Sequence, residues 1–206
     1  MISLNSILLI IVVFLVGVII FLVSSKKGAK LRLNSTEGEG VDWQNSLKDP
    51  VTKIYNKKHL MQRLQECMAR CDRDKENMAL VIWDIDGFVG FNDEFGQKEG
   101  DRLLQQVAVG IKKTVRVYDE IFRSGPDEFC AILSPADDDI STEVTRRVRE
   151  LVSKELFEND TEYAERDFSL TSGYVFYPSE CQSAEALLHA ANQALYKSRL
   201  THSGAK

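Results

Sequence analysis

Two short acidic segments, each placed beside apolar runs, constrain the fold of this chain most strongly. The apolar run 78–83 is followed at once by Asp84, which predicts a buried strand with a carboxylate at its carboxyl end. Residues 125–127 (Gly-Pro-Asp) separate the runs 120–122 and 129–133, a pattern typical of a β-hairpin. Carboxylates from two strands that meet at one sheet edge can hold a hard cation such as Mg²⁺, which in turn binds phosphates.

The spacing of apolar residues elsewhere predicts helices that pack on this sheet. Asn56 is a residue type that begins helices, and Gly96 is one that ends them. We expect helices from Asn56 to about residue 71, over 88–95, from Gly100 to about residue 115, over 144–152 and over 184–200, and a further strand over 168–176. Helices and strands in this order predict an α+β domain.

An unbroken apolar run, residues 7–23, precedes this domain. A helix of this length nearly spans a hydrocarbon core of about 30 Å. A cleaved signal peptide is the alternative, but it would carry basic residues before the run, and here Lys and Arg only follow it. We therefore expect a single-pass membrane helix with residues 1–6 outside, residues 24–48 as a polar linker and residues 49–206 as one cytoplasmic domain.

Charge and cysteine content exclude some function classes. The net charge of −5, without a basic stripe, argues against nucleic acid as a partner. The four cysteines lack paired C-x-x-C spacing, so we expect reduced, packed thiols in a cytosolic domain; disulfide or zinc roles are the alternatives. These residues are Cys67, Cys71, Cys130 and Cys181.

Four segments of the chain resemble the GGDEF domain of the diguanylate cyclase family. Residues 49–56 are similar to its opening D-x-L-T-G-L-x-N, residues 84–101 to D-I-D-x-F-K-x-x-N-D-x-x-G-H-x-x-G-D, and residues 191–196 to A-D-x-A-L-Y. Residues 124–129, Ser-Gly-Pro-Asp-Glu-Phe, stand where the family has its signature. The resemblance implies a central, mostly antiparallel sheet flanked by helices, in a protein of the bacterial inner membrane.

The resemblance also implies an activity and its residues. In the family, two domains meet face to face, each holding one GTP, and form cyclic di-GMP in a Mg²⁺-dependent reaction. When the family's roles are carried over by position, Asp84, Asp127 and the carbonyl of Ile85 would hold the metal. Asp127 and Glu128 would be the catalytic residues. The substrate would be bound by Ile85, Phe88, Asn92, Asp101 and Gly125.

Each of these residues also has an ordinary structural interpretation. Asp84 and Asp127 are residue types common at strand ends and in turns. Asn92 and Asp101, to which the resemblance gives the guanine edge, would serve as helix caps if they stood alone.

The chain departs from the family at several phosphate-facing positions. Pro126 replaces the second glycine of the signature, so it has no N–H and a fixed φ, although a type II′ turn with Gly125 first remains geometrically allowed. Val89 stands where the family has a phosphate-binding lysine, and Gln97 replaces a histidine. In the C-terminal K-x-x-G-R-N segment, Arg199 takes the place of lysine and Ser203 that of arginine. We therefore expect weak or no turnover.

A separate R-x-x-D segment, Arg116 to Asp119, resembles the family's inhibitory site for cyclic di-GMP. Arginine can fork to phosphate or guanine, and a carboxylate accepts from the guanine amine. The alternative is a surface ion pair contributing under about 1 kcal/mol.

Three functional hypotheses follow. The first is a membrane-tethered domain that binds cyclic di-GMP or a partner protein, with little catalysis. The second is a working, homodimeric diguanylate cyclase. The third is a scaffold that binds no nucleotide.

Overall fold

The computed structural model describes residues 47–154 and 169–203. The chain divides into two units, Met1–Ser46 and Leu47–Lys206. The predicted membrane helix (7–23) and nearly all of the predicted linker (24–48) lie outside the described residues. Within the described ranges, no helix has the length and apolar character needed to cross a membrane.

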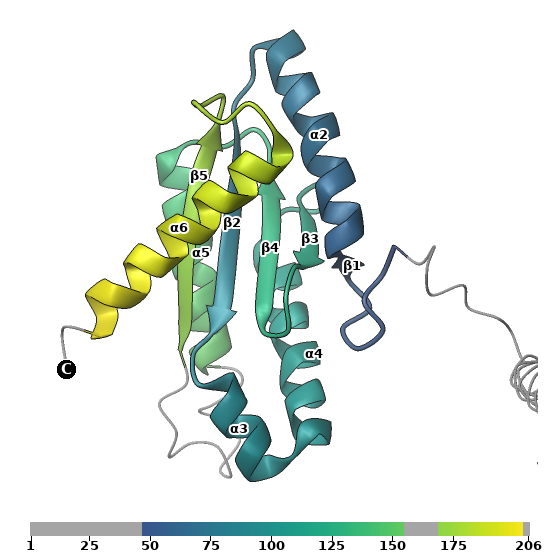
Figure 1. Ribbon diagram of the computed structural model, residues 1–206, viewed down its shortest axis with the longest axis vertical. Coiled ribbons are helices and arrows are strands. Elements are labelled where there is room, and N and C mark those ends of the chain that lie inside the picture. The colour runs from purple at the N-terminus through teal and green to yellow at the C-terminus, as the bar shows by residue number, and fades with distance from the viewer. Residues whose placement is uncertain (1–46, 155–168, 204–206) are drawn as a thin grey trace, which may run out of the picture. The chain divides into compact units, whose positions relative to one another are not determined.

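A mixed five-stranded sheet forms the centre of the second unit (Figure 1). Its strands, in the spatial order β1-β3-β4-β2-β5, are β1 (Tyr55–Asn56), β3 (Glu120–Arg123), β4 (Glu128–Leu133), β2 (Met78–Ile85) and β5 (Leu170–Tyr177). The pairing of β1 with β3 is parallel, and the other three pairings are antiparallel. The prediction of a mostly antiparallel sheet is confirmed.

Helices cover both faces of this sheet (Figure 1). They are α2 (Lys57–Asp74), α3 (Phe88–Phe95), α4 (Gln97–Thr114), α5 (Asp138–Val152) and α6 (Ala184–Ser203). Helices α2 and α6 pack on one face, against alternate residues of β2 such as Leu80 and Ile82. Helices α3, α4 and α5 pack on the other, against Val81 and Trp83. This alternation is the period of two that places successive strand side chains on opposite faces.

Most predicted elements are confirmed, with three corrections. Helix α5 begins at Asp138 and not at residue 144, because Asp137 is its N-cap and accepts from the N–H of Ile140 at 2.8 Å. Asn56 begins α2 as predicted, and its Oδ1 accepts from the N–H of His59 at 3.1 Å. However, α4 begins at Gln97 and not at Gly100, because Gly96, with φ 84°, ends α3 and starts α4 directly. The prediction also missed β1, whose two residues are too few to show a hydrophobic period.

The cysteines lie in the core or at its edge. Cys67, Cys71 and Cys130 are buried and Cys181 is half-buried, and all four are free thiols. Packing accounts for the first three, as the sequence predicts.

Helix α6 lies directly on the backbone of β5. Gly173 faces it, and a Cβ on this residue would lie 2.7 Å from the carbonyl carbon of Ala194 and equally close to the Cα of Leu195. Only a residue without a side chain allows this approach, which seats the helix above the middle of the sheet.

We expect Gly173→Ala to destabilise the domain by roughly 1–3 kcal/mol, because the methyl group forces α6 away from the sheet. Urea unfolding would measure this. Gly90→Ala is the matched control: nothing lies within 4 Å of a Cβ at that position of α3, so this change is expected to stabilise by about 0.5–1 kcal/mol. Equal stability of the Gly173 variant and the parent chain would contradict this account of how α6 is seated.

Candidate functional site

A pocket of about 280 Å³ lies where β2 ends. The register of β2 and β4 sets Asp84 directly opposite Glu128, so the end of β2 and the β3–β4 turn share one end of the sheet (Figure 1). The pocket is lined by Asp84, Ile85, Asp86, Gly87, Phe88, Val89, Asp127 and Arg199. The three residues predicted to hold a metal are therefore brought together, and α6 adds an arginine.

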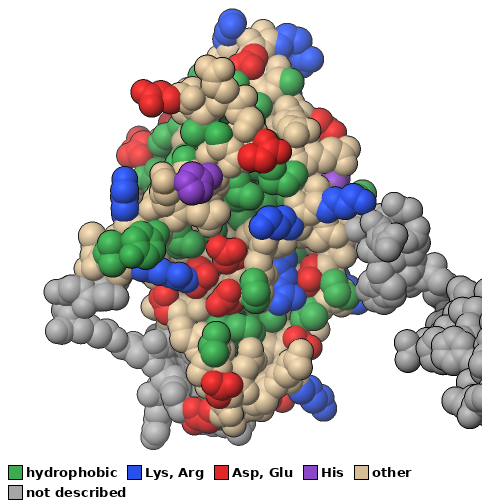
Figure 2. Space-filling model, in the orientation of Figure 1, with side chains coloured by type: hydrophobic (Ala, Val, Ile, Leu, Met, Phe, Trp, Pro, Cys, Tyr) green, Lys and Arg blue, Asp and Glu red, His purple; other side chains and the backbone are tan. Residues whose placement is uncertain are grey.

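Asp84 is the electrostatic centre of this pocket. It is 4% exposed and ion-paired with Arg199. Burial and the neighbouring Asp127 carboxylate raise the pKa of Asp84 to about 6, although Arg199 opposes the shift. Figure 2 shows acidic side chains gathered beside the C-terminal half of α6. Negative charge thus converges on this end of the sheet, and the Arg199 guanidinium compensates it at Asp84.

The loop after β2 is shaped by its own hydrogen bonds. Gly87, with φ 76°, turns the chain into α3, a conformation that glycine adopts without strain. The N–H of Ile85 donates to the carbonyl of Asp127 at 3.2 Å, and that of Asp86 to Ser169 at 3.0 Å. The family resemblance makes Ile85 and Phe88, at the two ends of this loop, substrate-binding residues, but the N–H groups of Ile85 and Asp86 are already bonded to protein carbonyls. The Asp86 carboxylate also accepts from Thr171 Oγ1 at 2.8 Å.

The turn between β3 and β4 does not adopt the type II′ geometry that the sequence allows. That turn requires a positive φ at Gly125, and the only glycines with positive φ in the described chain are Gly87 and Gly96. Instead, the N–H of Ser124 donates to the carbonyl of Glu128 at 3.0 Å, which closes a wider turn. Pro126 fits this turn but contributes no N–H to it.

Arg123 holds the turn, a role that sequence analysis missed. Its guanidinium donates to the carbonyls of Gly125 at 3.2 Å and Pro126 at 2.6 Å, and to Asp49 Oδ1 at 3.0 Å. Asp49 also accepts from the Thr52 N–H at 2.7 Å. The start of the domain is thereby fixed to the loop that carries Asp127. The sequence signal for this role is an arginine placed just before a turn that contains glycine. The sequence alone does not identify the groups that this arginine binds.

Asn92 and Asp101 are not helix caps, because they lie inside α3 and α4. The Asn92 side chain lies against Gly100, the neighbour of Asp101, and its Oδ1 is buried without a hydrogen-bond partner among the described residues. Neither residue lines the pocket at the end of β2, and the same is true of Glu128 and Gly125.

Arg116 and Asp119 lie in the segment between α4 and β3. The Arg116 N–H donates to Asp119 Oδ2 at 2.9 Å, and the guanidinium lies 5.8 Å from the ring centre of Tyr118. The two charges also attract each other: burial raises the pKa of Asp119, and Arg116 opposes that rise. Both residues line a second pocket, of about 490 Å³.

The residues at the end of β2 fit a hard cation. Asp84 and Asp127 supply carboxylate oxygens and Ile85 a carbonyl, the ligand types that Mg²⁺ prefers. The raised pKa of Asp84 reflects burial first and then the nearby carboxylates, which a divalent ion would neutralise. Across residues 47–154 and 169–203, no group of three or more His, Cys, Asp or Glu residues is clustered as metal ligands, so a backbone or other oxygen would have to complete the site.

Comparison with known proteins agrees with this geometry. The family model for "Diguanylate cyclase, GGDEF domain" matches residues 46–204. Diguanylate cyclase DgcP of Pseudomonas aeruginosa is 30% identical over 156 residues, which cover 76% of this chain and 23% of that protein. Diguanylate cyclase DosC of Escherichia coli K12 is 29% identical over 150 residues, covering 72% of this chain and 32% of DosC. The chain thus spans less than half the length of these relatives.

Solved structures show the same fold. A sensory box/GGDEF family protein from Caulobacter crescentus is 26% identical, with a TM-score of 0.66 over 76% of this chain and 99% of that one. SiaD of Pseudomonas aeruginosa, solved with its activator SiaC, has a TM-score of 0.68 at 22% identity, covering 94% of this chain and 70% of SiaD. The GGDEF domain of Caulobacter crescentus DgcB, solved with cyclic di-GMP, has a TM-score of 0.65 at 23% identity, covering 76% and 92%.

The raised pKa of Asp84 predicts a pH dependence of stability. A carboxyl whose pKa rises from 3.8 to about 6 on folding favours the folded state below pH 4 and loses that contribution as pH rises through 6. The loss is at most about 3 kcal/mol. Denaturant unfolding in chelator at pH 4 and pH 7.5 would measure it.

Two variants separate this group from the other acids. Asp84→Asn should remove the loss, and Arg199→Ala should enlarge it, because Arg199 lowers the pKa of Asp84. An unchanged pH slope in Asp84→Asn would show that other groups produce the dependence.

Proposed function

This chain belongs to the diguanylate cyclase GGDEF domain family, and from that premise we propose that it is a cyclic di-GMP signalling domain that binds nucleotide but turns over GTP weakly or not at all. The observation that carries the proposal is the pocket at the end of β2. It keeps Asp84, Asp127 and Arg199 around the turn into α3, but lacks other phosphate-facing groups of the family.

In this proposal, Asp84, Asp127 and the carbonyl of Ile85 hold Mg²⁺. A bound Mg²⁺ would neutralise phosphate charge and orient a triphosphate. It would also add to the charge compensation that Arg199 gives Asp84. Phe88 begins α3, and the first turn of a helix leaves N–H groups directed towards an anion.

Weak turnover follows from missing cations and missing donors. Val89 is 69% exposed at the position of the family's lysine, so the pocket mouth carries an apolar side chain there. Pro126 has no N–H. The N–H groups of Ile85 and Asp86 are bonded to protein carbonyls. Cations and oriented N–H groups stabilise the charge of a phosphoryl transition state, and each missing group costs about 3 kcal/mol.

The remaining predicted roles are parts of the same proposal. Asn92 and Asp101 would bind the guanine edge, since the buried Asn92 Oδ1 has no partner among the described residues. Gly125 would lie beside the nucleotide, and Glu128, next to the metal, would act with Asp127 in whatever catalysis remains.

Signalling would then depend on binding and not on synthesis. We propose Arg116 and Asp119 as the cyclic di-GMP site of this domain, with Asp119 accepting from the guanine amine. A partner protein, or a second copy of the domain, would recognise the form of the domain that has cyclic di-GMP bound. Residues 7–23 would tether the domain to the inner membrane, with the C-terminal domain in the cytoplasm.

A working cyclase is the second candidate, because Asp84 and Asp127 remain together in one pocket. Incubating the full chain with GTP and Mg²⁺ and separating the products by chromatography tests both candidates. We expect cyclic di-GMP at less than about a hundredth of the amount formed by an active family member under the same conditions, in line with the loss of one oriented donor.

Controls decide what any product means. Rapid Mg²⁺-dependent formation of cyclic di-GMP that disappears in Asp127→Ala would establish the cyclase. Absence of product, together with cyclic di-GMP binding that Arg116→Ala abolishes, would support the receptor. Absence of both would leave a scaffold, identified by a partner that binds without nucleotide.

A further inference from the structure

Asp86 lines the pocket at the end of β2, but it has no role in the site described so far. The family resemblance assigns the metal to Asp84, Asp127 and the carbonyl of Ile85, and it assigns nothing to Asp86. A third carboxylate therefore lies in the same pocket as the two proposed metal ligands. The groups that bind this carboxylate indicate what it does there.

The Asp86 carboxylate is held by two hydroxyl groups at the start of β5. Thr171 Oγ1 lies 2.8 Å from Oδ1 and 2.9 Å from Oδ2 of this carboxylate, and Ser169 Oγ donates to Oδ2. The backbone N–H of Asp86 also donates to the carbonyl of Ser169, at 3.0 Å. Both carboxylate oxygens and the N–H are thus bonded to the same short segment of the neighbouring chain.

The register of the sheet brings these groups together. Asp84 lies opposite Thr171, so the start of β5 lies beside the end of β2 (Figure 1). Thr171 is 5% exposed and Asp86 is half-buried. A hydrogen bond to an ionised acceptor is stronger than one between neutral groups, and partial burial strengthens it further. Asp86 therefore fastens the first residue of the loop after β2 to the sheet.

This attachment sets the direction of the Ile85 carbonyl. That carbonyl and the N–H of Asp86 belong to one trans peptide unit, in which C=O and N–H point in opposite directions. The N–H is directed at Ser169, on the β5 side of β2. The carbonyl must then point to the other side of β2, where β4 and the turn that carries Asp127 lie. This is the direction in which a metal ligand is needed.

We propose that Asp86 is a positioning residue for the cation site and not a third metal ligand. Its bonds to Ser169 and Thr171 keep the carbonyl of Ile85 directed at the side of the pocket that carries Asp127. The inference rests on the proposed function, because the site that Asp86 serves is the proposed Mg²⁺ site.

A change at Thr171 tests this role without altering any charge. Thr171→Val removes the hydroxyl, keeps the size of the side chain and leaves the Asp86 carboxylate in place, whereas Thr171→Ser restores the hydroxyl. Thr145→Val is the matched control. Thr145 is also buried, and its Oγ1 donates to the carbonyl of Ser141 at 2.7 Å within α5, but it does not line the pocket.

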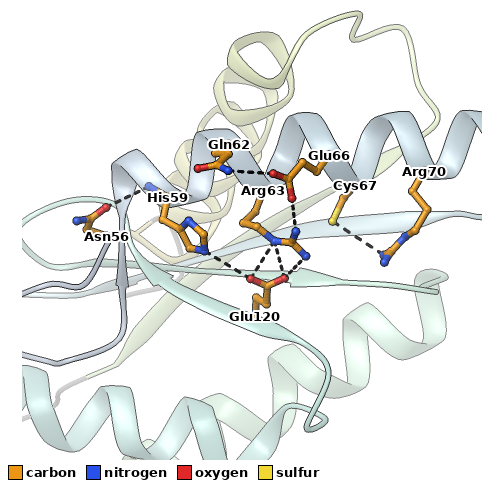
Figure 3. A network of polar contacts seen from close by, with 8 residues as sticks. All are labelled: Asn56, His59, Gln62, Arg63, Glu66, Cys67, Arg70 and Glu120. Carbon is orange, nitrogen blue, oxygen red and sulfur yellow. Dashed lines mark hydrogen bonds and ion pairs between the residues drawn. The ribbon is translucent and has the colours of Figure 1, made fainter. Parts of the chain in front are cut away.

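Asp86→Asn has a charge-matched control in Glu120→Gln. The Glu120 carboxylate on β3 is likewise held by neighbouring side chains: Arg63 Nε lies 2.8 Å from Oε1, and His59 Nε2 lies 4.0 Å from Oε2 (Figure 3). Glu120 does not line the pocket at the end of β2. Both variants remove one carboxylate charge from the domain, but only Asp86→Asn alters the loop after β2.

Mn²⁺ is the probe, because it accepts the same oxygen ligands as Mg²⁺ and its free form is measured by electron paramagnetic resonance. The full chain would be titrated with Mn²⁺, and each variant checked for folding by circular dichroism. We expect Thr171→Val and Asp86→Asn each to raise the Kd for Mn²⁺ roughly tenfold, as for loss of an outer hydrogen bond of a metal site. Thr171→Ser, Thr145→Val and Glu120→Gln should leave it unchanged.

The outcomes separate this inference from the proposed function. Unchanged or tighter Mn²⁺ binding in Thr171→Val would overturn the positioning role, and tighter binding would make the released Asp86 carboxylate a ligand. Equal weakening by Thr145→Val would also overturn it, because a general loss of stability would then explain the effect. If Asp127→Ala abolishes binding but Thr171→Val does not weaken it, the metal site stands without the positioning residue. Absence of Mn²⁺ binding by the parent chain would overturn both.

Discussion

The architecture depends on a central strand that is buried along its whole length and ends in an acid. Strand β2 is bonded on both edges and covered on both faces, so Asp84 has little access to water. A carboxyl group in such a place needs a nearby positive charge to stay ionised, and otherwise its pKa rises and favours the neutral acid; here Arg199 supplies the charge and burial still raises the pKa. Helix α6 supplies that charge through Arg199, while Gly173 and the buried residues Leu187 and Ala191 seat the helix on the sheet.

The sequence predicts the elements that have a clear period or a strong boundary residue. The apolar run 78–83, the Asn56 cap and the glycine that ends α3 all lead to elements that the structure contains. It fails where the deciding contact is distant in the chain. Strand β1 is defined by its pairing with β3, and Arg123 joins its turn to the start of the domain through Asp49, which lies 3.0 Å away. Local patterns contain no information about such partners.

For the candidate site, the sequence identified the metal-binding candidates that share a pocket, but not how their polar groups are used, and Asn92, Asp101 and Glu128 do not line that pocket. It placed Asp84, Asp127 and the loop after β2 together. It did not predict that the carbonyl of Asp127 takes the Ile85 N–H, or that the Asp86 carboxylate binds Thr171. Relative to the family motifs, cations are missing near Val89 and present at Lys53, where glycine is usual.

The contact between Gly173 and α6 also determines how accurately Arg199 can be placed. The helix touches the sheet backbone at Leu195, and Arg199 lies four residues, or about 6 Å, further along the axis. Because this distance along the axis is short, tilting the helix by about 10° about that contact would displace the Cα of Arg199 by only about 1 Å. Gly173, which is buried in β5, therefore limits how far the guanidinium of Arg199 on α6 can be displaced when the helix tilts.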